Sequence, residues 1–270
     1  MGKSYPVWLE EFTRGAFEDY LAEEKNPVAI VVIGSVEQHG AHLPLGMDMM
    51  AALGVAQRVA ERTRSVVVHP CWPGYSPHHM AFAGTISFRA ETLVNVLLDT
   101  IDSLATHGIK KILLLNGHGG NAEIMNYAAR LGKRRSKVRI VTSNAWFSGT
   151  TPEEAIADVD RHAGAKETAV AQAWFAELVE MERVEGFEPT AAFPPDVEAL
   201  RTDDPEDLAL RTQLVMAYID DTHQFTPSGI YGFEGADPNR ADVEAAHQFL
   251  ADTVEHFVRL ITYWKTIDSE

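Results

Sequence analysis

Three side chains able to bind a metal ion follow a short apolar run near the start of the sequence. Glu37 and His39 are two residues apart, so in an extended loop their side chains point the same way. Gly40 and Gly46 let the backbone turn and bring Asp48 back toward them. Carboxylates and imidazoles are the usual ligands of zinc and related divalent ions. We therefore expect Glu37, His39 and Asp48 to form part of a metal site.

A fourth candidate ligand is His118, in the segment Asn116-Gly117-His118-Gly119-Gly120-Asn121. Glycines on both sides leave this histidine projecting from a tight turn, with bare backbone around it for a metal or a substrate to approach. We expect the backbone amides of Gly119 and Gly120 to help hold a negatively charged oxygen. A phosphate-binding loop is the alternative, but the segment lacks both the Gly-Lys-Ser/Thr of a P-loop and the spacing of a dinucleotide fingerprint.

A third group is predicted at the start of a helix, where His162 and Glu167 are five residues apart. If both are helical, they lie within about 140° of each other around the axis, so both can face one pocket. We expect His162 to carry a proton near neutral pH and Glu167 to act as a metal ligand or as a partner in catalysis.

The charges of these groups favour two metal ions over one. Two divalent ions carry four positive charges, which Glu37, Asp48, Glu167 and a bridging hydroxide balance. With a single ion the same groups leave net negative charge in a pocket, which is unfavourable unless some are protonated. Asp48, a short carboxylate between the two loops, is our candidate for the bridging ligand. Zinc is the first expectation for the metal, although the same ligands accept manganese and iron.

Two further residues are candidates for substrate contact. His79 follows an apolar run that ends near His69, and Trp146 follows another, where it could stack on a flat ligand or belong to the core. Nucleophilic catalysis has less support, because Cys71 shows no sign of activation and no Gly-x-Ser-x-Gly elbow occurs. The loop from 226 to 240 is either a surface connection or one wall of the site.

The elements that must position these residues alternate as in an α/β fold. Four short apolar runs read as strands, and the first has no polar alternation, as in a parallel strand covered on both faces. The loops that leave such strands face the ligand crevice. The last third has no strong strand run, so its helices should cover the sheet or an oligomer contact. The predicted strands are 28–34, 65–69, 111–115 and 138–142, and the predicted helices are 49–62, 90–107, 123–131, 163–181, 205–221 and 241–264.

Composition excludes several other classes. The 270 residues include 23 Lys and Arg against 39 Asp and Glu, a net charge of −16, which argues against binding to nucleic acid or to an anionic membrane. No run approaches the roughly 18 apolar residues of a membrane span. The start lacks the apolar core of a signal peptide, and a single cysteine excludes an intramolecular disulfide, so we expect a cytoplasmic protein. The segment 186–205 is linker-like but too short to divide the chain, and we predict one domain over residues 1–270.

Taken together, three separated blocks resemble the creatininase family of metal-dependent amidohydrolases. They are Gly34-Ser35-Val36-Glu37-Gln38-His39-Gly40 with Leu43-Pro44-Leu45-Gly46-Met47-Asp48, then Asn116-Gly117-His118-Gly119-Gly120-Asn121, then His162-Ala163-Gly164-Ala165-Lys166-Glu167-Thr168. The resemblance implies a three-layer α/β/α fold with a mostly parallel central sheet, a dinuclear zinc or manganese-type centre, and a homo-oligomer, commonly a hexamer. It also implies that Glu37 and His118 bind one metal, that His39 binds the other, that Asp48 bridges them, and that His162 transfers a proton.

One position departs from the creatinine-hydrolysing members. Where they carry a glutamate ligand this chain has Gly120, which argues against creatinine as the substrate and leaves Glu167 to supply the second metal's carboxylate. The resemblance lies with a broader branch that includes deformylases, a peptide-trimming enzyme and a hydrolase that opens a keto-inositol ring.

The chemistry we expect is attack of a metal-activated water on a carbonyl, with His162 passing a proton to the leaving group. The expected substrate is a small molecule, a cyclic amide or formamide cleaved at a C–N bond. The alternatives are C–C cleavage of a cyclic ketone such as a keto-inositol, and a metal-binding protein without catalysis.

Overall fold

A four-stranded parallel sheet forms the centre of the molecule in the computed structural model. The strands lie in the order β2-β1-β3-β4, which confirms the predicted parallel arrangement. Their bounds are Val28–Ile33 for β1, Val66–Val68 for β2, Lys111–Asn116 for β3 and Arg139–Asn144 for β4. The structure describes residues 5–146, 160–184, 187, 221–224, 226–232 and 235–268.

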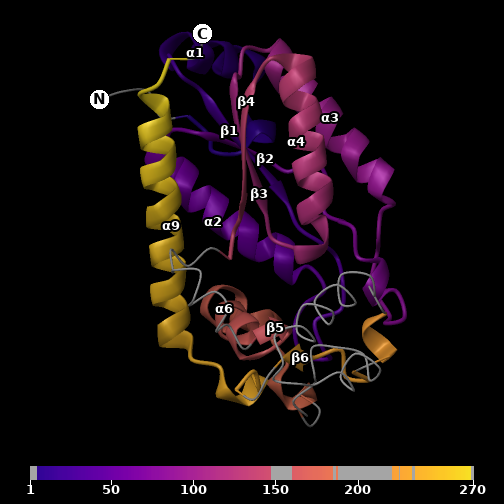
Figure 1. Cartoon of the computed structure of the whole chain (residues 1–270). Helices are drawn as coiled ribbons and strands as arrows, with labels where there is room; N and C mark the ends of the chain where they lie inside the picture. The colour runs from indigo at the N-terminus through magenta and orange to yellow at the C-terminus, as the bar shows by residue number, and fades with distance from the viewer. Residues whose placement is uncertain are drawn as a thin grey trace, which may run out of the picture.

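Helices cover both faces of this sheet, giving the expected three layers (Figure 1). The central strands β1 and β3 are buried along their whole length, which is why their sequences are almost entirely apolar. Alternate residues of β1 serve opposite layers: Val28, Ile30 and Val32 pack with α2 and α9, while their neighbours pack with α3 and α4. The helices span Met47–Thr63 (α2), Ala90–Thr106 (α3), Ala122–Ser136 (α4) and Val243–Lys265 (α9).

Shorter elements complete the described part of the chain. Helix α1 spans Arg14–Glu23, and α6 spans Ala165–Phe175 and packs with α2 and α9. Three-residue 3-10 turns occur at Leu9–Glu11, Pro77–His79, Gly119–Asn121, Ala176–Leu178, Met181–Arg183, Thr222–Gln224 and Pro238–Arg240.

The last third differs from the sequence prediction. Asp160–His162 (β5) and Tyr231–Gly232 (β6) pair as a small antiparallel sheet, where no strand was expected. Each strand is too short, and β5 too polar, to produce an apolar run. The helix expected from residue 163 to 181 begins at Ala165 and ends at Phe175. The predicted helix 205–221 and the linker 186–205 lie outside the described residues, apart from residues 187 and 221.

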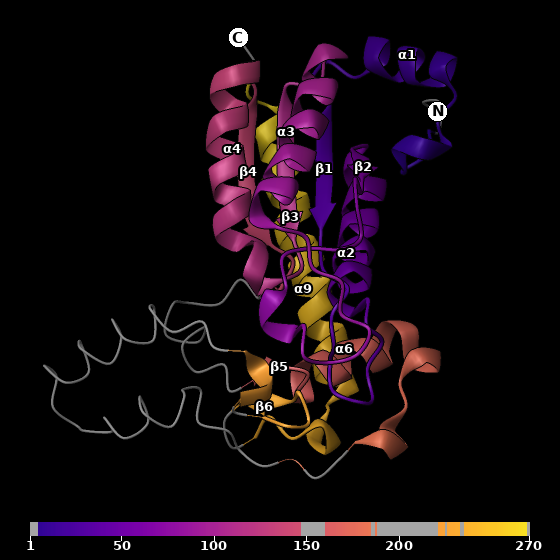
Figure 2. The ribbon, with the colours of Figure 1, turned by 90° about the vertical axis from the view of Figure 1, so that its right-hand side faces the viewer.

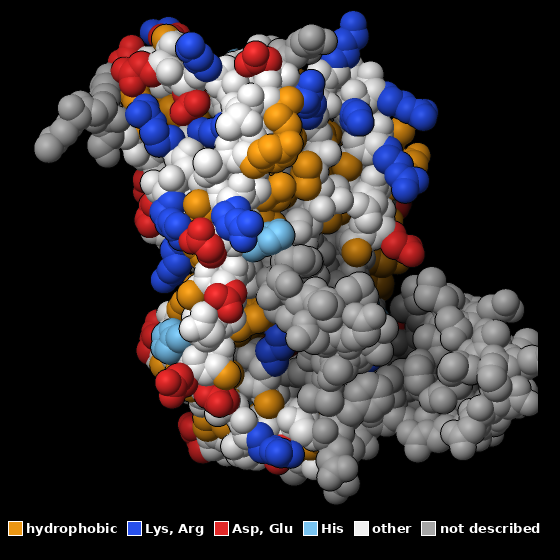
Figure 3. Space-filling view, turned by 60° about the vertical axis from the view of Figure 1, so that its left-hand side comes forward, with side chains coloured by type: hydrophobic (Ala, Val, Ile, Leu, Met, Phe, Trp, Pro, Cys, Tyr) orange, Lys and Arg blue, Asp and Glu red, His pale blue; other side chains and the backbone are white. Residues whose placement is uncertain are grey.

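The small sheet and α6 lie beyond the carboxyl ends of the central strands (Figure 2). Because β1 and β3 are neighbours, with Ile33 opposite Asn116, the loops that follow them emerge side by side. Among the described residues no helix is both long and apolar enough to cross a membrane. On the face in Figure 3, Asp and Glu side chains are scattered among Lys and Arg side chains, so the acidic excess forms no continuous patch there.

Candidate metal centre

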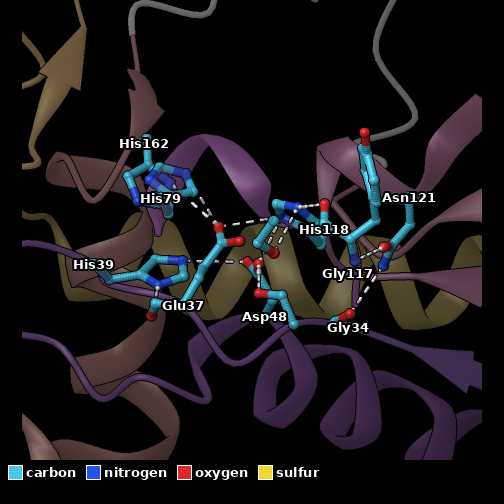
Figure 4. A network of polar contacts seen from close by, with 12 residues as sticks. Gly34, Glu37, His39, Asp48, His79, Gly117, His118, Asn121 and His162 are labelled. Atoms are coloured by element: carbon cyan, nitrogen blue, oxygen red, sulfur yellow. Dashed lines mark hydrogen bonds and ion pairs between the residues drawn. The ribbon is translucent and has the colours of Figure 1, made fainter. Parts of the chain in front are cut away.

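One carboxylate, Asp48, divides its two oxygens between two histidines at the carboxyl edge of the sheet (Figure 4). Its Oδ1 lies 3.3 Å from His39 Nε2, and its Oδ2 lies 3.1 Å from His118 Nδ1. Glu37 Oε1 is also 3.1 Å from His118 Nδ1, while a Glu167 oxygen is 3.7 Å from His39 Nε2. Two groups able to hold a metal therefore share Asp48: Glu37, Asp48 and His118 on one side, and His39, Asp48 and Glu167 on the other.

The loop after β1 folds back as the glycines predicted. Gly40 has a φ of +64°, which glycine adopts readily, and the Glu37 amide donates to the Leu45 carbonyl at 2.9 Å. Asp48 then lies in the first turn of α2 and accepts a hydrogen bond from the Ser35 hydroxyl at 2.7 Å. A helix start favours a carboxylate, because its free amides carry partial positive charge.

The hydrogens of His39 and His118 are placed by backbone carbonyls, which can only accept. His39 Nδ1 donates to the Glu37 carbonyl at 3.1 Å, and His118 Nε2 donates to the Tyr75 carbonyl at 3.1 Å. In the neutral rings the other nitrogen of each is then a bare lone pair. Those lone pairs face carboxylate oxygens at 3.1–3.3 Å, so the site needs a cation between them.

The pKa shifts of His39, His118 and Asp48 also indicate that a positive charge belongs at this site. Burial alone would lower the pKa of His39, but Asp48, Glu167 and Glu37 raise it to about 10. The pKa of His118 is likewise raised well above its usual value, against burial, by Glu37 and Asp48. Burial would raise the pKa of Asp48, yet the two histidines hold it well below its ordinary range. A proton or a metal ion at each lone pair satisfies this arrangement.

Glu37 gives a further indication of a missing positive partner. Its side chain is 1% exposed, and while His118 Nδ1 carries no hydrogen, neither carboxylate oxygen has a hydrogen-bond partner among the described residues. An ionised carboxylate buried in this state is costly unless a cation compensates it. Together with the mixed oxygen and nitrogen donors, this observation shows that the residues fit a divalent metal.

His162 and Glu167 reach the site from the far side. His162 ends β5, outside the helix, so the condition that both residues are helical is not met; its Nε2 donates to the Gln38 carbonyl at 2.7 Å, and its Nδ1 lies 3.8 Å from Glu37 Oε1. Ala163 has a φ of +56°, and its amide donates to Glu167 Oε2 at 2.6 Å. His162 and Glu167 therefore reach one pocket because the chain turns at Ala163, and not because they share a face of one helix.

A cavity of about 370 Å³ opens onto these groups. All four residues expected to contact substrate line it, namely His79, Gly119, Gly120 and Trp146. Trp146 donates its indole hydrogen to the Gly117 carbonyl at 2.7 Å, which fixes the ring at the pocket wall. The loop from 226 to 240 contributes Tyr231, so it is a wall of the site and not only a surface connection.

Sequence reasoning missed the residues that hold the site together through hydrogen bonds. Asn116 Nδ2 donates to the His118 carbonyl, and Asn121 Nδ2 donates to the Gly34 carbonyl at 2.9 Å, so the two asparagines tie the β3 turn to β1. Gln38 contacts both His79 and His162. The repeated asparagines around the glycine turn were a usable signal, whereas nothing in the sequence distinguishes Gln38.

Comparison with known proteins places the chain in a family. A family model described as Creatininase, creatinine amidohydrolase, matches residues 10–261. A creatinine amidohydrolase of Pseudomonas putida is 29% identical over 214 residues, covering 72% of this chain and 81% of that protein. A 3-dehydro-scyllo-inosose hydrolase of Thermotoga maritima is 30% identical, covering 61% of this chain and 56% of that protein. A mycofactocin precursor peptide peptidase of Mycolicibacterium smegmatis is 35% identical over 150 residues, or 53% and 56% of the two chains.

Solved structures show the same fold. A creatinine amidohydrolase (creatininase) superposes with a TM-score of 0.76 at 25% identity, covering 98% of this chain and all of that one. Creatininase structures described as a Zn-Zn type mutant and as a manganese form each give a TM-score of 0.75 at 24% identity, covering 96% of this chain and 98% of theirs.

Proposed function

The chain belongs to the creatininase family of hydrolases, and from this membership we propose that it uses two divalent metal ions to hydrolyse a C–N bond beside a carbonyl. The observation that carries the proposal is the split carboxylate of Asp48. A short side chain whose two oxygens face two separate nitrogen donors is suited to bridging two ions.

In the proposed centre, Glu37 and His118 would hold one ion, His39 and Glu167 would hold the other, and Asp48 would serve both. Ions held there would lower the pKa of a water molecule and polarise the substrate carbonyl. Zinc is the first candidate, with manganese or iron as alternatives, because histidine and carboxylate ligands accept all three.

The remaining steps fall to the chain's own residues. His162 lines the cavity and donates through Nε2, so its Nδ1 is unprotonated and can take a proton from the attacking water and pass it to the leaving nitrogen. Burial, then His39 and His79, hold the pKa of His162 well below its usual value, which keeps the ring neutral before the reaction. The Gly119 and Gly120 amides at the cavity wall could stabilise the oxygen that gains charge.

The surroundings of Gly120 favour a substrate other than creatinine. A Cβ at this position would lie 2.5 Å from His118 Nε2 and 2.5 Å from the Tyr75 carbonyl oxygen. A glutamate ligand there would displace the turn, so Glu167 is the carboxylate available to the second ion. We propose a cyclic amide or a formamide as the substrate class.

The alternative is C–C hydrolysis of a cyclic ketone. Its specific support is the similarity to the 3-dehydro-scyllo-inosose hydrolase, because a nucleophilic water can attack an activated ketone as well as an amide. A metal-binding role without catalysis fits less well, because the ligands border a cavity large enough for a small molecule and are not closed off.

A metal-loaded activity screen tests these proposals. The protein would be stripped of metal, reloaded with zinc or manganese, and offered creatinine, formamidopyrimidines, cyclic amides and oxidised inositols. We expect metal-dependent ring opening of a cyclic amide or release of formate from a formamide, with two metal ions per chain; Glu37→Gln should lose turnover and metal. Turnover of the inositols alone would favour the C–C alternative, and unchanged metal content in Glu37→Gln and His118→Gln would contradict the site.

Three more properties remain proposals: a hexamer, a cytoplasmic location and a single domain over residues 1–270. Light scattering of the purified protein measures the first, and fractionation of the source cells measures the second. Limited proteolysis tests the third, for which we expect no stable fragment.

A further inference from the structure

The side-chain amide of Gln38 is held in one orientation by two backbone groups. Its Oε1 accepts from the Gly40 amide at 2.9 Å, and its Nε2 donates to the Gly229 carbonyl at 3.1 Å. Rotating the amide by half a turn would set donor against donor and acceptor against acceptor. These two hydrogen bonds therefore fix which end of the Gln38 amide is the NH₂ group and which is the oxygen.

The second hydrogen of that NH₂ group points at a histidine. Gln38 Nε2 lies 2.9 Å from His79 Nδ1, and an amide nitrogen can only donate. His79 Nδ1 must therefore accept, which places the single hydrogen of the neutral ring on Nε2. A doubly protonated ring is disfavoured, because its Nδ1 hydrogen would face the hydrogens of Gln38.

His79 lines the cavity, and its Nε2 is buried without a hydrogen-bond partner among the described residues. The residue is 1% exposed, and the nearest carboxylate oxygen, Glu37 Oε1, is 3.5 Å from this nitrogen. With a hydrogen on this nitrogen, His79 offers a donor and not the lone pair that a metal ligand needs.

Gln38 also places the hydrogen of the neighbouring ring. The backbone carbonyl of Gln38 accepts from His162 Nε2 at 2.7 Å, which leaves His162 Nδ1 without a hydrogen, 3.8 Å from Glu37 Oε1. The two rings stack with centroids 4.4 Å apart. One residue thus sets a donor, His79, beside an acceptor, His162, on the same side of Glu37.

We propose that Gln38 is a positioning residue that fixes the His79 hydrogen on Nε2, so that His79 donates a hydrogen bond to the substrate oxygen. This is the oxygen that receives the electron pair of the carbonyl double bond when water adds to the carbon. His162, held by the same residue, handles the proton. Only the substrate contact rests on the proposed function; the hydrogen placement does not.

The contact between Gln38 and His79 requires a glycine at position 229. Gly229 has a φ of +77°, and a Cβ there would lie 1.9 Å from Gln38 Oε1. Any larger residue would strain the backbone and push the amide away from His79. The loop that carries Gly229 is therefore fitted to the Gln38 side chain.

Nitrogen NMR tests the hydrogen placement without a substrate. In the zinc-loaded full chain labelled with ¹⁵N-histidine, two-bond proton–nitrogen spectra distinguish the two neutral forms of each of the 11 rings. Loss of signals in His79→Gln and in His162→Gln assigns the two rings. We expect both to carry the hydrogen on Nε2, and a His79 hydrogen on Nδ1 in the unsubstituted protein would overturn the proposal.

Substitution of Gln38 separates the two histidines. In Gln38→Glu a carboxylate oxygen faces His79 Nδ1, so we expect the His79 hydrogen to appear on Nδ1, while His162 keeps its pattern because its partner is backbone. Gln57→Glu is a matched control on an exposed helix face, where the amide contacts Glu61. An unchanged His79 signal in Gln38→Glu contradicts the proposal. If that variant does not fold, Gln38→Met should give His79 in both forms.

Kinetics test the donor itself, with a substrate found in the screen. His79→Gln keeps an N–H near the position of Nε2, whereas His79→Leu removes it. We expect His79→Leu to lower kcat at least ~100-fold with both zinc ions retained, and His79→Gln to stay within ~10-fold of the unsubstituted enzyme. Loss of zinc in His79→Leu, or equal losses in both variants, would overturn the donor role. A failed screen would count against the proposed function and leave the NMR result standing.

Discussion

Ser35 donates its hydroxyl hydrogen to Asp48 Oδ2 over 2.7 Å, and both side chains are buried. This bond fixes the carboxylate proposed to bridge the two metals. Because partners of metal ligands typically contribute 10–100-fold to affinity, we expect Ser35→Ala to weaken zinc binding ~10-fold. Competition with a chromophoric chelator measures the change. Ser65→Ala is a matched control. Ser65 is also buried and is hydrogen bonded to Thr63 at 2.8 Å, but it precedes the amino end of β2, away from the site at the carboxyl ends of the strands.

Metal uptake should release protons. The pKa of His39 is raised to about 10 and that of His118 is also raised, so at pH 7 the metal-free protein holds a proton at each facing nitrogen. Zinc must displace both, because it binds the neutral ring. We expect release of about two protons per chain and an affinity that increases with pH through neutrality. Calorimetry in buffers of different ionisation enthalpy measures the number, and a value near zero would contradict the paired lone-pair arrangement.

Glu167 separates a two-metal centre from a one-metal centre. Its carboxylate reaches both His39, at 3.7 Å, and the amide of Ala163. If it is a ligand, Glu167→Gln should reduce the metal content from two ions per chain to about one, with His118 and Glu37 still holding the first. Elemental analysis of the dialysed protein decides. Two ions retained with reduced turnover would limit Glu167 to orienting its neighbours.

Substitution by alanine should destabilise the protein at Gly117 but not at Gly119, although both glycines belong to the same turn. A Cβ at Gly117 would lie 2.2 Å from the Asp48 carbonyl oxygen, so Gly117→Ala should displace the start of α2 and cost about 1–3 kcal/mol of unfolding free energy. At Gly119 nothing lies within 4 Å of the added carbon, and we expect Gly119→Ala to fold normally. Urea denaturation of both variants measures the difference. Equal destabilisation would show that the close approach at Gly117 is not the cause.

Cys71 should react slowly in the folded protein. Burial raises the pKa of its thiol to about 11, against an ordinary value near 9, so the reactive thiolate is ~100-fold scarcer at pH 8. We expect iodoacetamide to label the folded chain ~100-fold more slowly than the urea-unfolded chain, with a rate that rises about tenfold per pH unit. Comparable rates in the two states would contradict the burial of this thiol.

The layers and the group of candidate metal ligands could be predicted from the sequence, because both depend on local patterns of residues. Apolar runs without alternation indicated buried parallel strands, and the glycines around His118 indicated a tight turn. The pairing of β5 with β6 could not be predicted, because it joins segments about 70 residues apart whose few residues include polar ones. Gln38 was missed for a related reason. Its role depends on Gly229 and His79, which only the folded chain brings to it.

Glu37 and Gln38, which precede His39, each serve the site twice, once through the side chain and once through the backbone carbonyl. The Glu37 carbonyl orients His39, and the Gln38 carbonyl orients His162. Insertion or deletion of one residue here would therefore exchange which groups face the cavity and which face the protein. A library of single-residue insertions and deletions, scored for turnover, tests this. We expect residues 37–39 to tolerate such length changes less than any surface loop, even where single substitutions still fold.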